Sequence, residues 1–154
     1  MSSNIDPLQG HRMDDADIDR FLTEAGIGVL SMAKDDVPYG LPLSFGYDGD
    51  DRLYFVFRGY SAAGRKVTYA ERAETVSFLV YDLASKDRWR SVILSGSFDR
   101  IAADEWTAAR EAILDNAFRA RLLTGGDVES NPRVWALDVE EKSGRQIGGE
   151  PAEQ

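Results

Sequence analysis

The sequence contains no cysteine and only one histidine, His11. Without cysteine, the chain cannot form a disulfide framework, a thiolate metal site or a thiol nucleophile. His11 lies in an N-terminal stretch without periodic hydrophobicity, so we expect it to be exposed. A Ser-His-Asp triad within the ordered domain and a histidine-rich metal site are therefore not expected, and no metal is predicted.

Long hydrophobic runs and the common catalytic motifs are also missing. No apolar run approaches the ~20 residues that cross a bilayer, and the N-terminal residues lack the basic head and apolar middle of a signal peptide. We therefore expect a cytoplasmic protein that does not enter a membrane. The sequence has no G-x-G-x-x-G after a strand, no Walker loop, no H-E-x-x-H and no G-x-S-x-G.

Positive charge is scarce. Lysine and arginine number 18 against 27 acidic residues, which gives a net charge of -9 and an isoelectric point of about 4.6. Such a chain repels phosphate backbones unless it has a concentrated basic stripe, so nucleic-acid binding is not expected. An acidic surface of this kind suits a high-salt environment, and an ordinary acidic cytoplasmic protein is the alternative.

The hydrophobic pattern predicts a mainly β domain with flanking helices. At 154 residues the chain is expected to form one domain, 14–145, between flexible tails at 1–13 and 146–154. Connections of four or five residues between the first strands favour an antiparallel meander. Together, the predicted strands indicate a six-stranded antiparallel barrel decorated by helices; they cover residues 27–33, 39–47, 52–58, 75–82, 89–101 and 133–141.

Three helices are expected between or before these strands. The first covers 15–25, where Asp14 and its acidic neighbours supply capping oxygens and Gly26 ends the helix. The second is short, within 62–73, and the third covers 103–123. Gly96, within the long fifth strand, is expected to mark a bulge or bend.

The segment "RGYSAAGRK", residues 58–66, places two cations between a strand and a helix. Backbone N–H groups at the helix start, the Ser61 hydroxyl, and the Arg65 and Lys66 side chains could converge there on one phosphate. In the alternative interpretation, the same cations form a surface turn and pair with Glu71 or Asp82. Pairs of adjacent carboxylates elsewhere lie in predicted turns, caps or strand ends, and are interpreted as solvated surface groups.

Four stretches in this order resemble the FMN-binding split-barrel proteins related to pyridoxamine 5′-phosphate oxidase, in the branch of the nitroimidazole-resistance proteins. They are "FLTEAGIGVLSMA", "VPYGLPLSFGYDGDDRLYFVF", "GRKVTYAERAETVSFLVYD" and "WRSVILSGSFDRI". The resemblance covers about residues 14 to 145. It implies a six-stranded split β-barrel and a homodimer that holds FMN in two clefts at the subunit interface.

The resemblance also implies which residues contact the cofactor. The phosphate contacts fall on Arg58, Ser61, Arg65 and Lys66. Contacts to the flavin ring, often from the backbone, fall on the second strand at Leu41, Pro42, Leu43 and Ser44. The other subunit contributes Trp89, Arg90 and Ser91 from the fifth strand, with Trp135 of the last strand as a weaker candidate.

The sequence departs from the family at its C-terminus. Pyridoxamine-phosphate oxidases carry an arginine and a histidine there that hold substrate, whereas "VWALDVEEKSGRQIGG" has no histidine. Vitamin B6 oxidation is therefore not expected, and a contact from His11 to the flavin or to a partner remains an alternative to simple exposure. The resemblance implies a flavin-dependent oxidoreductase that acts on a small redox substrate. The alternatives are a non-catalytic flavin- or heme-binding sensor module and a reductase that uses the deazaflavin F420.

Overall fold

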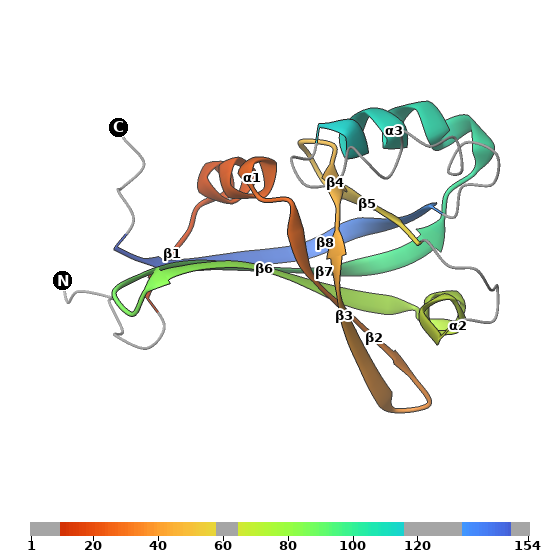
Figure 1. The fold of residues 1–154 in the computed structure, drawn as a ribbon, viewed down its shortest axis with the longest axis horizontal. Helices are drawn as coiled ribbons and strands as arrows, with labels where there is room; N and C mark the ends of the chain where they lie inside the picture. The colour runs from red at the N-terminus through yellow and green to blue at the C-terminus, as the bar shows by residue number, and fades with distance from the viewer. Residues whose placement is uncertain (1–9, 58–64, 116–133, 149–154) are drawn as a thin grey trace.

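One curled antiparallel sheet runs the length of the molecule, with α1 and α3 on one side of it and α2 near one end (Figure 1). The computed structural model describes residues 10–57, 65–115 and 134–148. The strands are β1 (His11–Arg12), β2 (Ile27–Lys34), β3 (Val37–Ser44), β4 (Gly46–Tyr47), β5 (Arg52–Val56), β6 (Thr75–Ser85), β7 (Arg88–Arg100) and β8 (Val134–Ile147). The helical segments are α1 (Asp15–Glu24), α2 (Arg65–Arg72), the 3-10 turn η1 (Ala103–Glu105) and α3 (Trp106–Leu114).

The sheet has the order β3-β2-β6-β7-β8-β5-β4, and β1 pairs with β8. All of these pairs are antiparallel. The predicted mainly β class, with a split barrel formed by a curled sheet, is thus confirmed. Each of the six predicted strands is present, but the predicted count is too low. The two-residue strand β1 carries no periodic signal of its own, and the structure divides the predicted strand 39–47 into β3 and β4, which lie at opposite ends of the sheet order.

The first helix begins where its capping residue predicts. The Asp14 carboxylate accepts a hydrogen bond from the Asp17 N–H at 2.8 Å, which satisfies one of the free donors of the first turn. Ile18, Phe21 and Leu22 form the buried side of α1. Their spacing of three and four residues is the helical period that identified this segment in the sequence.

The other two helices contact different parts of the sheet. The second, α2, buries Ala70 against the main core, and α3 packs over β4 and β5. The predicted third helix is confirmed from η1 to Leu114 and is capped by Asp115, and its later residues lie outside the described part of the chain. None of the described helices is long and apolar enough to span a bilayer.

The main core lies on one side of β6 and β7, where buried residues alternate with residues of the opposite side. Val76, Phe78 and Val80 of β6 and Val92 and Leu94 of β7 are each at most 2% exposed. A second, smaller cluster joins α3 to the edge of the sheet through Tyr54, Ala109, Ile113, Val134 and Ala136. Because side chains alternate between sheet faces, this arrangement leaves the opposite side of β6 and β7 without a covering layer from the described residues.

Gly96 lies at a break in the register, as the sequence predicts. Ser95 pairs with Glu141 whereas Gly96 pairs with Val139, so Glu140 is an extra residue in β8. A Cβ at Gly96 would come within 1.8 Å of the Asp138 carbonyl oxygen. Only a residue without a side chain therefore fits this bulge.

The ordered domain extends beyond the predicted limits of 14–145. His11 and Arg12 pair with Gln146 and Arg145, and Met13, which is buried, donates its N–H to the Gly144 carbonyl at 2.8 Å. Parts of both expected tails are thus paired with each other. Residues 1–9 and 149–154 lie outside the described residues.

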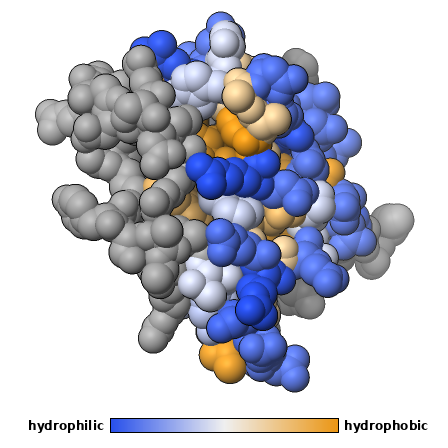
Figure 2. Space-filling view, turned by 90° about the vertical axis from the view of Figure 1, so that its right-hand side faces the viewer, coloured by the Kyte–Doolittle hydropathy of each residue, from blue (hydrophilic) through white to orange (hydrophobic). Residues whose placement is uncertain are grey.

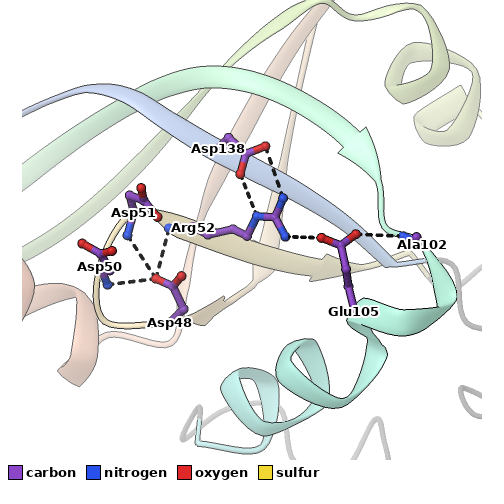
Figure 3. A network of polar contacts seen from close by, with 7 residues as sticks. All are labelled: Asp48, Asp50, Asp51, Arg52, Ala102, Glu105 and Asp138. Atoms are coloured by element: carbon purple, nitrogen blue, oxygen red, sulfur yellow. Dashed lines mark hydrogen bonds and ion pairs between the residues drawn. The ribbon is translucent and has the colours of Figure 1, made fainter.

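A polar network joins the start of β5 to β8 and to the beginning of α3 (Figure 3). The Arg52 guanidinium lies 2.6 Å from an Asp138 carboxylate oxygen and 2.7 Å from Glu105. The Asp48 carboxylate accepts backbone hydrogen bonds from Asp50, Asp51 and Arg52 at 2.8 to 3.1 Å. The turn between β4 and β5 is therefore held by Asp48, while Arg52 joins β5 to β8 and to η1.

Candidate functional site

Two groups of the predicted cofactor contacts, at the start of α2 and at the start of β7, lie at opposite ends of the sheet. Arg65 and Lys66 begin α2, which precedes the first residue of β6, Thr75, and Thr75 pairs with Ser97. Trp89 lies near the start of β7, eight residues before Ser97, which corresponds to about 27 Å of extended strand. Figure 1 shows this separation, with α2 at one end and the turn between β6 and β7 at the other.

We call the end that carries α2 the helix end. Arg65 and Lys66 occupy its first helical turn, where backbone N–H groups lack partners within the helix. Arg58 and Ser61, the other two predicted phosphate contacts, lie outside the described residues. Figure 2 views the molecule from this side, and the coloured surface is mostly hydrophilic around a small apolar area. The start of α2, with its free backbone N–H groups, is thus compatible with an anion at this end.

The four residues predicted on β3 divide between the two faces of that strand. Leu41 and Leu43 pack against the main core, so their side chains belong to the interior. Pro42 and Ser44 pair with Val29 and Ile27 and point to the opposite face because successive side chains alternate. The strand ends the described sheet order, which leaves backbone groups along its outer edge for a ligand.

Trp135 lies in the core and not at a surface. Its side chain is 6% exposed, and its ring stacks on Phe98 at 5.3 Å and on Phe57 at 6.0 Å between centroids. The cofactor contact predicted for Trp135 stays a prediction, for a side chain that packs against two aromatic rings of the core. An aromatic residue at a regular strand position looks the same in the sequence whether it packs inward or contacts a ligand.

We call the end formed by the β6–β7 turn the hairpin end, and here Trp89, Arg90 and Ser91 are all half-buried. The Arg90 guanidinium lies 4.3 Å from the centre of the Phe21 ring. It also donates to Asp82 at 3.0 Å and lies 3.7 Å from Glu24. Arg90 is thus held by α1 and by the neighbouring strand, with its charge largely compensated.

Beside these residues lies a cavity of about 370 Å³ between α1, the β6–β7 hairpin and the end of β8. Sequence reasoning identified Trp89 and Arg90 from this lining but missed Phe21, Arg88 and Gln146. No local signal could find Phe21 or Gln146, because the cavity brings together residues more than a hundred positions apart. A local pattern could have indicated only Arg88, which directly precedes the predicted Trp89.

The perturbed ionisable groups lie away from both ends. The pKa of Glu105 is lowered, first by its hydrogen bond from Arg52 and then by the backbone N–H of Ala102. Burial raises the pKa of the Tyr47 hydroxyl, and its hydrogen bond to Asp19 adds to the effect. Both groups tie structural elements together, and within the described residues no group of His, Asp or Glu side chains could hold a metal ion.

Comparison with known proteins assigns the chain to a family. The model for pyridoxamine 5′-phosphate oxidase matches residues 14–146. An uncharacterized Rhizobium meliloti protein is 29% identical over 76 residues, a match that covers 49% of this chain and 47% of that protein. The chain thus matches about half the length of this relative.

Solved structures share the fold at low sequence identity. A Mesorhizobium loti FAD-binding protein has a TM-score of 0.71 and 22% identity, covering 90% of this chain and 98% of that chain. A candidate 5-nitroimidazole resistance protein from Bacteroides thetaiotaomicron has a TM-score of 0.70 and 20% identity, covering 87% and 85%. The FAD and heme binding protein of Mycobacterium smegmatis has a TM-score of 0.66 and 21% identity, covering 92% and 75%. With the curled antiparallel sheet and the match over residues 14–146, these findings show that the chain belongs to the pyridoxamine 5′-phosphate oxidase-like family of split-barrel proteins.

Proposed function

We propose that two copies of this chain form a dimer that holds FMN between the helix end of one subunit and the hairpin end of the other. The observation that carries this proposal is the separation of the predicted contacts. Arg65 and Lys66 lie at one end of the sheet and Trp89 and Arg90 near the other. One chain cannot bring these groups to a single ligand, whereas an antiparallel pair of chains can.

The exposed side of the sheet supports the same assembly. Four large apolar side chains are at least half exposed on the face opposite the main core: Ile27 (50%), Tyr81 (59%), Leu83 (67%) and Ile93 (50%). The register places them on one face, since Ile93 pairs with Leu79, and Leu79 pairs with Val29. We call these four residues the outer face. Burial of such a patch against a second copy would be favourable.

The residues of the helix end fit the phosphate of a flavin mononucleotide. A pair of cations at a helix start combines charge with free N–H donors, which is the chemistry that binds phosphate. The backbone edge at Pro42 and Ser44 can contact the polar rim of a flavin ring, and Trp89 can pack on its flat surface. Bound FMN would supply the redox chemistry, by accepting hydride or electrons at N5, for a small acceptor. The chain then grips the phosphate, orients the ring and excludes water.

The first experiment is to identify any chromophore in the purified protein. We expect a yellow protein with the visible absorption band of an oxidised flavin, and FMN as the released compound by mass spectrometry. A colourless protein that takes up no added FMN would contradict the proposal. Turnover would then be tested by anaerobic reduction of the flavin-loaded protein, followed by addition of candidate acceptors.

Two alternatives give different chromophores in the same experiment. A heme-binding module is suggested by the heme-binding structural neighbours, and it would show a Soret band. Against it, the only histidine, His11, is exposed in the edge strand β1. A deazaflavin such as F420 would be separated by its mass, and its acidic tail would require more basic surface than a chain of net charge -9 offers.

A further inference from the structure

The side of the sheet that carries the outer face also carries charged residues of β8. A Cβ at Gly144 would meet side chains of the core at 2.8 to 3.1 Å, so this residue faces the core. Because successive side chains alternate, Glu141, Ser143 and Arg145 point to the opposite side. The register agrees, since Ser143 pairs with Ile93, a member of the outer face.

Two arginines lie next to each other at the hairpin end of this side. Arg12 of β1 pairs with Arg145 of β8, so both side chains point to the same face. Arg12 is exposed and Arg145 is half-buried, and neither has an ion pair among the described residues. Like charges directly opposite each other on neighbouring strands are unfavourable. This pair of arginines therefore favours contact with an acidic group.

Two glutamates lie farther from the hairpin end, on the same strand. Glu140 and Glu141 are exposed, and within the part of the chain that the structure describes neither has an ion pair. With Ile93 and neighbouring serines they line a hollow of about 510 Å³. Lys142 also lines it, but its ammonium lies 3.8 Å from Asp19 of α1. The hollow thus offers room and negative charge to a long cationic side chain.

The arginines and glutamates cannot meet within one chain. Arg145 and Glu141 are four residues apart on β8, which corresponds to about 13 Å of extended strand. Ser143 lies midway between them. A two-fold axis that crosses the strands at this level places Arg145 of each copy opposite Glu141 of the other, because in a symmetric interface every contact occurs twice.

We propose that Arg145 and Glu141 form two symmetric ion pairs between two copies of this chain, and that these pairs fix the antiparallel orientation of the dimer. The ion pairs presuppose the dimer proposed above, in which the helix end of one subunit meets the hairpin end of the other. Apolar contact at the outer face drives association, whereas charge selects the orientation. If the hairpin ends of both copies met instead, their arginines would lie at the same level and repel each other.

The test is charge reversal in two separate variants of the full-length protein. Arg145→Glu places two acidic groups in each contact and Glu141→Arg places two basic groups, so each variant alone should dimerise at least about a hundredfold more weakly. An equimolar mixture of the two variants restores opposite charges in both contacts and should dimerise as the wild type does. Analytical ultracentrifugation measures the association, and native mass spectrometry identifies the mixed dimer by its mass.

Arg20→Glu is the matched control for the charge change. Arg20 is an exposed cation of α1, the helix that packs on the core side of the sheet. This variant should remain a dimer. An equal loss of dimer in Arg20→Glu would show that net charge, and not the contact, controls association, and would overturn the ion pair.

The outcomes separate these ion pairs from the dimer itself. A monomeric wild type would contradict the proposed dimer and the ion pairs with it. A dimeric wild type whose Arg145→Glu variant dimerises equally well would overturn the ion pairs alone, and so would a mixture that forms no mixed dimer. Circular dichroism shows whether each variant keeps its fold, and the mixture decides the result even where one variant alone is unstable. None of these measurements depends on bound flavin.

Discussion

At the scale of single residues, two glycines differ in whether the structure leaves room for a side chain. A Cβ at Gly96 would meet the Asp138 carbonyl oxygen at 1.8 Å, and backbone atoms cannot easily move away. At Gly40, in the edge strand β3, the nearest atom would be the Ser31 hydroxyl at 3.6 Å, which is an ordinary contact. Both glycines lie within strands, but of the two only Gly96 is required by packing.

We therefore predict that Gly96→Ala lowers the free energy of unfolding by ~2–3 kcal/mol, because overpacking displaces the bulge and its ladder hydrogen bonds. Gly40→Ala is the control and should change it by less than ~0.5 kcal/mol. Urea unfolding followed by circular dichroism measures both. Equal effects of the two substitutions would contradict the role assigned to the bulge.

Glu105 gives a prediction about pH at the same scale. Its pKa is lowered in the folded state, mainly by Arg52, so its ionised form stabilises the fold. The contribution is present above the unfolded pKa of about 4.5 and is lost as the pH falls through the lower folded value. Because the side chain is 36% exposed, we expect only about 0.5–1 kcal/mol after solvent screening.

Glu105→Gln should accordingly lose stability at neutral pH and show a smaller further loss between about pH 5 and pH 3 than the wild type. Asp104→Asn is the matched control, since Asp104 is an exposed carboxylate of the same turn without an ion pair in the described residues. Urea midpoints at several pH values give the comparison. A Glu105→Gln variant with the wild-type pH profile would show that the Arg52 contact does not stabilise the fold.

At the scale of elements, the start of α2 is where the cofactor proposal is tested. Removal of both cations in the double variant Arg65→Ala and Lys66→Ala should reduce flavin affinity by a few hundred-fold or more, because each charge-assisted contact contributes ~1.5–3 kcal/mol. The flavin content of the purified variant and its affinity for added FMN measure the loss. Arg72→Ala, at the opposite end of the same helix, is the control and should retain flavin. Undiminished flavin in the double variant would exclude this phosphate site.

The long strands were predictable as elements because their alternation is a local property of the sequence. β6 alternates Val76, Phe78 and Val80 toward the core, and such a period of two is visible without knowledge of the partner strand. β1 was not predictable, since its two residues form a strand only through their pairing with Gln146 and Arg145. Trp135 shows the same limit, because its core position depends on Phe57 and Phe98 beside it.

At the scale of the whole molecule, the proposed dimer depends on the outer face. We predict that the protein is a dimer of twice the 17.1 kDa chain mass, and that Leu83→Asp with Ile93→Asp makes it a monomer. Both side chains are at least half exposed in the single chain, so the substitutions should disturb the interface far more than the fold. Light scattering coupled to size-exclusion chromatography measures the mass.

Val37→Asp is the control for this variant. Val37 is 54% exposed but lies beside the β2–β3 turn, away from the outer face, so the variant should remain a dimer. The monomeric variant should also lose flavin, because each proposed site combines groups from both subunits. A native monomer that binds FMN would contradict this assembly.

The acidic composition gives a separate expectation at this scale. If the surface is adapted to high salt, screening of its net charge of -9 should raise the thermal midpoint in concentrated KCl. An ordinary acidic protein would show little change.

The sequence by itself determined the antiparallel β2–β3 hairpin, the capped first helix and the basic start of α2, because each depends on neighbours within a few positions. It also pointed to Gly96, although the Asp138 carbonyl that requires a glycine there belongs to a distant strand. It also determined the absence of thiol chemistry, since there is no cysteine. The tertiary structure alone decided that Trp135 is a core residue, that the predicted cofactor contacts lie at opposite ends of the sheet, and that Arg88 and Gln146 share a cavity. These features arise from strand order and register, which bring together residues distant in sequence. No local pattern encodes that proximity.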